Sequence, residues 1–218
     1  MSANEKINGK FNYNNIQKLN KNFMYKDLKR SNCYNSDFSG SNFNYTSFRG
    51  AHFKSCNFYG CSFKSAEFVA TNFKKSKFKK AKFEDVVFDC ANLDGVDFKG
   101  AEFKNTIFLC TNISKAINLN ISNSDVIVFD EIPELNINEN LENAIKSAMN
   151  NKFIKNSRVL DTKDGSISPI STMILLQNFD ENTLIRGLNF IEANLDRDFC
   201  TLSYVIRAIE NYKKEELI

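Results

Sequence analysis

The chain contains few side chains whose types and spacing could support catalysis or metal binding. His52 is its single histidine, so a Ser-His-Asp or Cys-His arrangement would have to be built around this one imidazole. The six cysteines include no Cys-x-x-Cys pair, and one histidine leaves no Cys/His set for zinc. The sequence also lacks the GxxxxGKS or GxxxxGKT pattern of a phosphate-binding loop. We therefore expect a protein that is not an enzyme, with no catalytic residues, no metal site and no cofactor.

Lysine is the charged residue that gathers most densely. Six lysines fall within residues 74–82, and others precede and follow this run. Such a belt could contact an acidic protein surface, or it could bind nucleic acid weakly and in a salt-dependent, sequence-independent manner. A solvated surface that discourages aggregation is the simpler alternative, and nucleic acid is not the favoured partner. The candidate interaction residues are Lys54, Lys64, Lys74, Lys75, Lys77, Lys79, Lys80, Lys82, Lys99 and Lys104.

A five-residue repeat must position these lysines. Residues 31–115 form 17 consecutive pentads, and the central residue is Phe in 14 of them. The residue two places before each centre is always small, and the other positions are mostly polar. Five residues turn a helix by about 500°, which would scatter the Phe side chains around it. In a plain strand an odd step sends alternate Phe to opposite faces. Each pentad must therefore contain its own bend and form one side of a stacked coil.

This segment resembles the pentapeptide-repeat family, whose motif is A(D/N)Lxx with Leu or Phe at its centre. Residues 91–95, Ala-Asn-Leu-Asp-Gly, match that motif letter for letter. The resemblance implies a right-handed, four-sided β-helix with 20 residues per coil. A column of Asn32, Asn72, Asn92 and Asn112, with His52 filling the gap, supports this period. Five of the eight glycines lie two residues after a centre, where a type II turn needs positive φ.

The period of 20 assigns the remaining reactive side chains to positions in the coil. His52 should lie outside, as one member of the asparagine column. Cys56 and Cys61 take the small inward position and should be inert packing groups. Cys90 and Cys110 should lie outside, one coil apart, close enough for a disulfide in principle. Since the chain has no export signal, two reduced neighbours are the simpler expectation.

The chain divides into parts that differ in pattern and charge. Residues 31–115 carry 12 basic and 8 acidic groups, whereas residues 116–218 carry 10 and 16. We predict a mainly β protein with an α-helical part: a right-handed four-sided β-helix solenoid followed by a small C-terminal α-helical unit. The predicted boundaries are an N-terminal tail or cap over 1–20, the pentapeptide-repeat β-helix over 21–117, a cap or linker over 118–135, and helices over 136–218.

About four helices are expected after residue 138. Ser168-Pro169 should begin one, Asp180 should cap the next, and Asp196 or Asp198 should cap the last. Apolar residues at helical spacing are usually core and less often a partner surface. A unit this small could complete its core against a second copy, giving a homodimer, or against the last coil of the solenoid. The candidate packing or dimer residues are Leu184, Leu188, Ile191, Leu195, Phe199, Leu202, Ile206 and Ile209.

Three functions follow from these features. The first is a non-enzymatic structural protein that presents a rigid β-helical surface to an unidentified protein partner. The second comes from the resemblance alone: family members that confer quinolone resistance protect DNA gyrase by resembling duplex DNA. Such mimics need a strongly acidic surface, whereas residues 31–115 are net basic. The third is binding of nucleic acid or another anionic surface by the Lys74–Lys82 belt. No apolar stretch approaches a membrane span or a signal peptide, so we expect a cytoplasmic protein without membrane contact.

Overall fold

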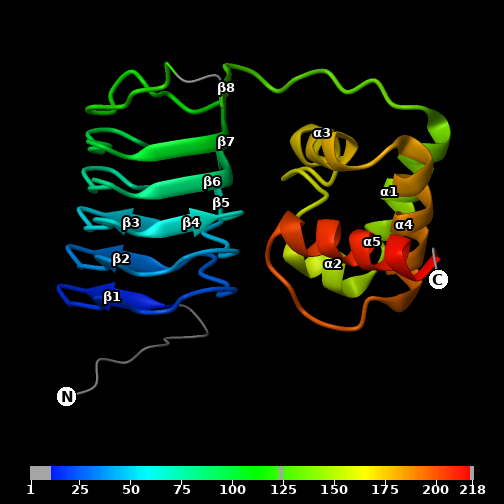
Figure 1. Cartoon of the computed structure of the whole chain (residues 1–218), viewed down its shortest axis with the longest axis horizontal. Coiled ribbons are helices and arrows are strands. Elements are labelled where there is room, and N and C mark those ends of the chain that lie inside the picture. The colour runs from blue at the N-terminus through cyan, green and yellow to red at the C-terminus, as the bar shows by residue number, and fades with distance from the viewer. Residues whose placement is uncertain (1–10, 123–124, 217–218) are drawn as a thin grey trace. The chain divides into compact units, whose positions relative to one another are not determined.

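The structure is a computed structural model that describes residues 11–122 and 125–216. The chain divides into two compact units, Met1–Glu131 and Ile132–Ile218. The first is a β-solenoid and the second is built from helices (Figure 1). Among the helices that the structure describes, none has the length and apolar character that crossing a membrane requires.

The solenoid stacks parallel coils of 20 residues. Its strands pair at this offset throughout, as in the register Asn12↔Asn32↔His52 and the register Phe63↔Phe83↔Phe103. Successive coils lie one above the other in Figure 1. The strands are β1 (Asn12–Asn14), β2 (Asn32–Tyr34), β3 (His52–Lys54), β4 (Ser62–Lys64), β5 (Glu67–Val69), β6 (Lys82–Asp89), β7 (Glu102–Leu109) and β8 (Val126–Phe129).

Each coil has four sides, because bridges recur in four separate columns. They begin at Asn12, Gln17, Asn22 and Asp27, and each residue pairs with the one 20 positions later. We number the sides by their pentads. Face 1 holds the pentads that start at 11, 31, 51, 71 and 91, and faces 2, 3 and 4 hold those that start 5, 10 and 15 residues later. The predicted four-sided β-helix is confirmed.

Phenylalanine rings fill the interior of the solenoid, stacked in columns from one coil to the next. On face 3, Phe43, Phe63 and Phe83 stack almost parallel, with ring centroids 5.3 and 5.1 Å apart. Rings of adjoining faces meet edge to face or tilted; Phe58 and Phe63 are an edge-to-face pair at 5.9 Å. Central Phe side chains from Phe38 to Phe98 are at most 1 % exposed. Because each buried Phe contributes roughly 1.5–3 kcal/mol to the stability of the folded state, these stacked columns stabilise a narrow fold.

Every pentad from residue 11 to 110 ends in a left-handed residue. This corner residue lies two after the centre, and 20 consecutive corners have φ between +45° and +69°. Only five of them are glycine; the others include Asn15, Lys75 and Cys110. Positive φ was predicted from the glycines, but the structure extends it to side chains that ordinarily avoid this conformation. Most corner N–H groups donate to the next coil, as Lys75 N–H does to Asp94 O (2.9 Å), and these bonds offset the conformational cost.

The small inward residue is also a hydrogen-bonding group, which the sequence analysis did not anticipate. The buried Ser76 hydroxyl accepts the N–H of Cys56 (2.9 Å) and donates to Phe53 O (2.6 Å) in the coil below. Thr111 makes the same pair of bonds with Ala91 N–H and Phe88 O. Serine and threonine at this position therefore satisfy backbone groups that the narrow interior would otherwise leave unpaired.

The solenoid extends beyond both predicted boundaries, 21 and 117. Its first described coil starts at Phe11, where Tyr13 is a buried centre and Lys18 lies over the Tyr13 ring. Lys18 takes the central position of the next pentad, 16–20, in place of Phe, and this departure concealed the first coil. At the other end Asn118 adopts φ +55°, out of phase with the earlier corners, and β8 still pairs with β7 in the 20-residue register. Residues in the predicted tail and the predicted linker thus belong to the coil stack.

The second unit contains five described helices rather than about four. They are α1 (Glu139–Ala148), α2 (Lys152–Ser157), α3 (Pro169–Asn178), α4 (Glu181–Asn194) and α5 (Leu202–Glu216). Ser168 and Asp180 cap α3 and α4 as predicted. The extra helix arises because α1 ends at Ala148 and Asn151 caps a separate helix, α2. Asp196 and Asp198 precede α5 by four residues or more, so the cap predicted at either of them is wrong.

Candidate interaction surface

The lysine belt lies on three adjoining faces of the coil formed by residues 71–90. Lys74 and Lys75 lie on face 1, Lys77, Lys79 and Lys80 on face 2, and Lys82 on face 3; all except the half-buried Lys79 are exposed. Lys54 and Lys64 belong to the coil before, and Lys99 and Lys104 to the coil after. The structure therefore brings together the ten lysines that the sequence singled out, although they do not share one environment.

The face 3 lysines and Lys79 of face 2 are neutralised by acids. Glu84 lies between Lys64 and Lys104, with 3.1 Å from its Oε1 to each Nζ. Hydrogen bonds from these two lysines lower the pKa of Glu84, and its carboxylate raises the pKa of Lys64. Lys82 pairs with Glu102 (3.5 Å), and Lys79 with Asp97 (3.1 Å). These exposed pairs contribute little stability, but they cancel the positive charge on this part of the belt.

The lysines of face 1, with three of face 2, form the unneutralised part of the belt. Lys54, Lys74 and Lys75 on face 1, and Lys77, Lys80 and Lys99 on face 2, make no ion pair with a residue that the structure describes. Lys80 lies over the Tyr59 ring, 5.8 Å from its centroid. The ion pairs thus divide the predicted belt, leaving its net positive charge on faces 1 and 2.

The histidine and cysteines occupy the positions that the period predicts. His52 is exposed in the asparagine column, in register with Asn32 and Asn72. Cys56 and Cys61 are fully buried, and burial raises the pKa of each thiol to about 12, so both are unreactive at neutral pH. Cys90 and Cys110 point outward as free thiols. Although the Cys90 residue is exposed, partial desolvation of its thiol, with Asp89 and Cys110 beside it, raises the pKa of Cys90 to about 12.

Comparisons with known proteins agree with this geometry. Residues 31–68 and 66–105 match the profile of the pentapeptide repeats, in eight copies. The solenoid is a pentapeptide-repeat domain. The profile covers roughly a third of the chain, and the structure adds further coils at both ends of the match.

Solved pentapeptide-repeat structures share low sequence identity with the chain. A pentapeptide-repeat protein from the Arabidopsis thaliana thylakoid lumen is 19 % identical, with 48 % of this chain and 83 % of that one covered and a TM-score of 0.36. HetL of the cyanobacterium Nostoc, involved in heterocyst differentiation regulation, is 17 % identical, with 49 % and 48 % covered and a TM-score of 0.27. QnrB1, a plasmid-mediated fluoroquinolone resistance protein, is 14 % identical, with 54 % and 84 % covered and a TM-score of 0.18. No curated protein sequence matches the chain.

The helical unit after the pentapeptide-repeat domain uses most of the predicted dimer residues for its own core. Side chains of Leu184, Leu188, Ile191, Leu202 and Ile209 are at most 7 % exposed. The other three, Leu195, Phe199 and Ile206, pack partly against the same cluster. These residues hold α4 and α5 against each other and against the other helices, so they do not form an exposed face.

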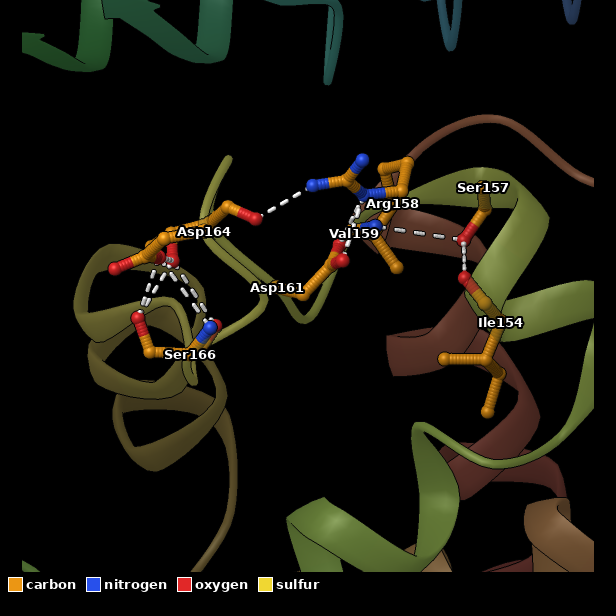
Figure 2. Close-up of polar contacts among 8 residues, drawn as sticks. Ile154, Ser157, Arg158, Val159, Asp161, Asp164 and Ser166 are labelled. Carbon is orange, nitrogen blue, oxygen red and sulfur yellow. Dashed lines mark hydrogen bonds and ion pairs between the residues drawn. The ribbon is translucent and has the colours of Figure 1, made fainter.

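A polar cluster around Arg158 closes the loop between α2 and α3 (Figure 2). Arg158 ends α2 at φ +63° and forms an ion pair with Asp161, with Nε 2.6 Å from its carboxylate. Asp164 accepts a hydrogen bond from the Ser166 hydroxyl (2.6 Å) and another from Thr162, and these bonds lower the pKa of Asp164 to about 2. The cluster is a turn held by its own side chains. In the described part of the chain, no three His, Cys, Asp or Glu residues gather as a metal ion would require.

Proposed function

We propose that the chain is a non-enzymatic interaction protein whose pentapeptide-repeat solenoid presents rigid faces to a protein partner. The observation that carries the proposal is that, within each pentad, the residues that determine the fold are separate from the residues that are exposed to solvent. Central and inward residues, such as Phe78 and Ser76, are buried and determine the fold. Outward residues of the same coil, such as Lys74 and Lys77, are exposed and have no part in the core. Recognition can therefore depend on the outward columns while the coil stack stays constant.

The charge on the solenoid bears on the two alternatives. Gyrase protection through resemblance to DNA would require an acidic surface, whereas the most prominent charged feature on the described solenoid is the part of the lysine belt on faces 1 and 2. The unneutralised lysines of that belt support the other alternative, nucleic-acid binding. Such binding should weaken steeply with salt.

A photo-crosslinker placed on each side of one coil tests the proposed function. p-Benzoyl-phenylalanine would replace Lys74, Lys79, Glu84 or Asp89, which occupy equivalent outward positions on faces 1 to 4 of the coil 71–90. In cells that naturally express the chain, we expect a discrete crosslinked protein from one face or two adjoining faces, competed by excess chain without the crosslinker. Absence of a competed crosslink from all four faces would contradict the proposal.

We further propose that two copies associate through α3, in place of the α4 and α5 residues that the sequence suggested. α3 is apolar around most of its circumference, and Met173, Ile174 and Leu176 are only half-buried. A helix that is apolar all round ordinarily lies between other elements. Met173 and Leu176 also line a groove of about 300 Å³ with Pro133 and Leu135.

Light scattering measures this association directly. We expect a dimer for the full chain and a monomer for Met173→Lys, because a charge in the interface would be buried without a partner. Lys155→Met, which alters an exposed residue of α2, is the matched control and should remain dimeric. A monomeric wild-type chain would contradict dimerisation and leave the proposal for the solenoid faces unchanged.

A further inference from the structure

Face 1 of the solenoid differs from the other three faces in carrying no acid over its first four coils. Between residues 11 and 90, Asp37 lies on face 2, Glu84 and Asp85 lie on face 3, and Asp27, Glu67 and Asp89 lie on face 4. The outward side chains of face 1 are amides, lysines, one serine, one tyrosine and the histidine. They are Asn12, Asn14, Asn15, Asn32, Tyr34, Asn35, His52, Lys54, Ser55, Asn72, Lys74 and Lys75, and we call this set the amide–lysine face.

The register places the three cations of this face close together. Tyr34 pairs directly with Lys54, and the bridge His52↔Asn72 places Lys74 one coil further along the same column. Neighbouring coils are about 4.8 Å apart. Lys75 follows at the corner, where its N–H bonds to Asp94 O. Three exposed ammonium groups thus lie within two coils, without an ion pair to any described residue.

The asparagines around these lysines offer hydrogen-bond donors. The Asn72 side-chain oxygen already accepts the Lys74 N–H (3.0 Å), so this amide has its NH₂ group left for a ligand. Asn35 and Asn15 are bonded to each other between coils, with 3.0 Å from Nδ2 to Oδ1, which fixes their orientation. Cations and amide donors on one surface are complementary to acceptors that carry negative charge.

We propose that the amide–lysine face binds a carboxylate-rich surface of a protein partner. This inference rests on the proposed function and names the face and the chemistry of its partner. Protein is favoured over nucleic acid because the face contains no arginine for bidentate phosphate contacts and one aromatic side chain, Tyr34, for base stacking. Face 3 is the internal contrast, because its lysines are already held by Glu84 and Glu102.

Two triple variants of equal charge change test the inference on the full chain. Lys54→Gln/Lys74→Gln/Lys75→Gln removes the cations of the amide–lysine face, and Lys64→Gln/Lys82→Gln/Lys104→Gln removes the same number from face 3. The probe is fluorescently labelled poly-L-glutamate at low salt, measured by anisotropy. We expect at least 10-fold weaker binding for the face 1 variant and less than 2-fold for the face 3 variant, with both unfolding at the wild-type temperature.

Four results would overturn the inference. The first is that the wild-type chain does not bind poly-L-glutamate. The second is an equal loss of binding in both variants, which would reflect net charge alone. The third is that the wild-type chain binds a 20-nucleotide oligothymidine more tightly than poly-L-glutamate and that the face 1 variant abolishes this binding. The fourth comes from the crosslinking experiment. A crosslink from position 79, 84 or 89 with none from position 74 would leave the interaction function standing while removing face 1 from it.

Discussion

The solenoid and the helical unit bury apolar side chains in different ways. In the solenoid one residue type recurs at one position, and Phe63 contacts Phe43 and Phe83 in nearly the same stacked geometry. In the helical unit each contact is individual: the α4 residue Gly187 fits against Ile209 of α5, and Asn151 caps α2 while also bonding to Glu192 O and Leu195 O. The effect of a substitution should therefore depend on the class of position in the solenoid and on the particular neighbours in the helical unit.

The largest effect should come from emptying a central position. Phe63→Ala removes a fully buried ring with stacked neighbours above and below, and we expect a loss of about 3–5 kcal/mol in the free energy of unfolding. Phe58→Leu is the control, because leucine already fills a central position at Leu93, and it should cost about 1 kcal/mol. Denaturant unfolding followed by circular dichroism measures both. Equal losses in the two variants would show that filling the central position of a pentad does not determine the free energy of unfolding.

The helical unit should be most sensitive where two helices touch. A Cβ added at Gly187 would lie 2.6 Å from Cγ2 of Ile209, so Gly187→Ala forces α4 and α5 apart. Over-packing of this kind should cost about 2–3 kcal/mol. Ile209→Ala removes both γ carbons that the added Cβ would meet, so the double variant Gly187→Ala/Ile209→Ala should lose less free energy of unfolding than the two single variants lose together, measured by the same unfolding curves. A double-variant loss equal to that sum would contradict the contact.

An intermediate loss of stability should come from removing the hydroxyl of Thr111, but not from removing that of Thr71, which has the equivalent position two coils away. Thr111 accepts the Ala91 N–H (3.0 Å), whereas Thr71 only donates to Phe48 O, which already accepts the Ala51 N–H. Thr111→Val leaves a buried donor unpaired and should cost roughly 1–2 kcal/mol. Thr71→Val should cost less than about 1 kcal/mol. The difference between the two melting curves is the measurement, and reversed order would refute the hydrogen-bond assignment.

The smallest effect should follow from replacing a corner glycine of the solenoid. Gly60 has φ +63° and open space around the position of a Cβ, and non-glycine residues occupy most equivalent corners. Asparagine tolerates this conformation, so Gly60→Asn should change the free energy of unfolding by no more than about 0.5 kcal/mol. A loss comparable to that of Gly187→Ala would remove the contrast between the two units.

The solenoid could be predicted from sequence because its rule is local. Spacing alone placed Phe at the centre, Cys56 inside, His52 outside and the lysines on three faces. The rule failed where a pentad departs from it, as at Lys18, and it gave no sign of the bonds made by Ser76 and Thr111. Those bonds depend on which N–H groups of the inward residues, such as those of Cys56 and Ala91, lack a partner in their own coil, and this becomes apparent only when coils are stacked.

The helical unit and the charge balance of the belt were less predictable. Helix starts at Ser168 and Asp180 follow from local capping, whereas Asn151 caps α2 and also donates hydrogen bonds to Glu192 O and Leu195 O, which are distant in the sequence. The sequence showed ten lysines as one belt. Their separation into neutralised and unneutralised parts required the 20-residue register, which places Glu84 between Lys64 and Lys104. Dimerisation and the partner of the solenoid stay predictions.

Amide hydrogen exchange resolved by NMR tests the stacked solenoid most directly. In the pentad 71–75, Asn72 N–H donates to Ala51 O, Phe73 N–H to Asn92 O and Lys75 N–H to Asp94 O. Lys74 N–H, in contrast, bonds only to the side chain of Asn72, in a hydrogen bond that is exposed to solvent. We expect slow exchange at residues 72, 73 and 75 and fast exchange at 74, with the same pattern in the equivalent pentads. Uniformly fast exchange across residues 71–75, or slow exchange at 74 alone, would contradict this expectation.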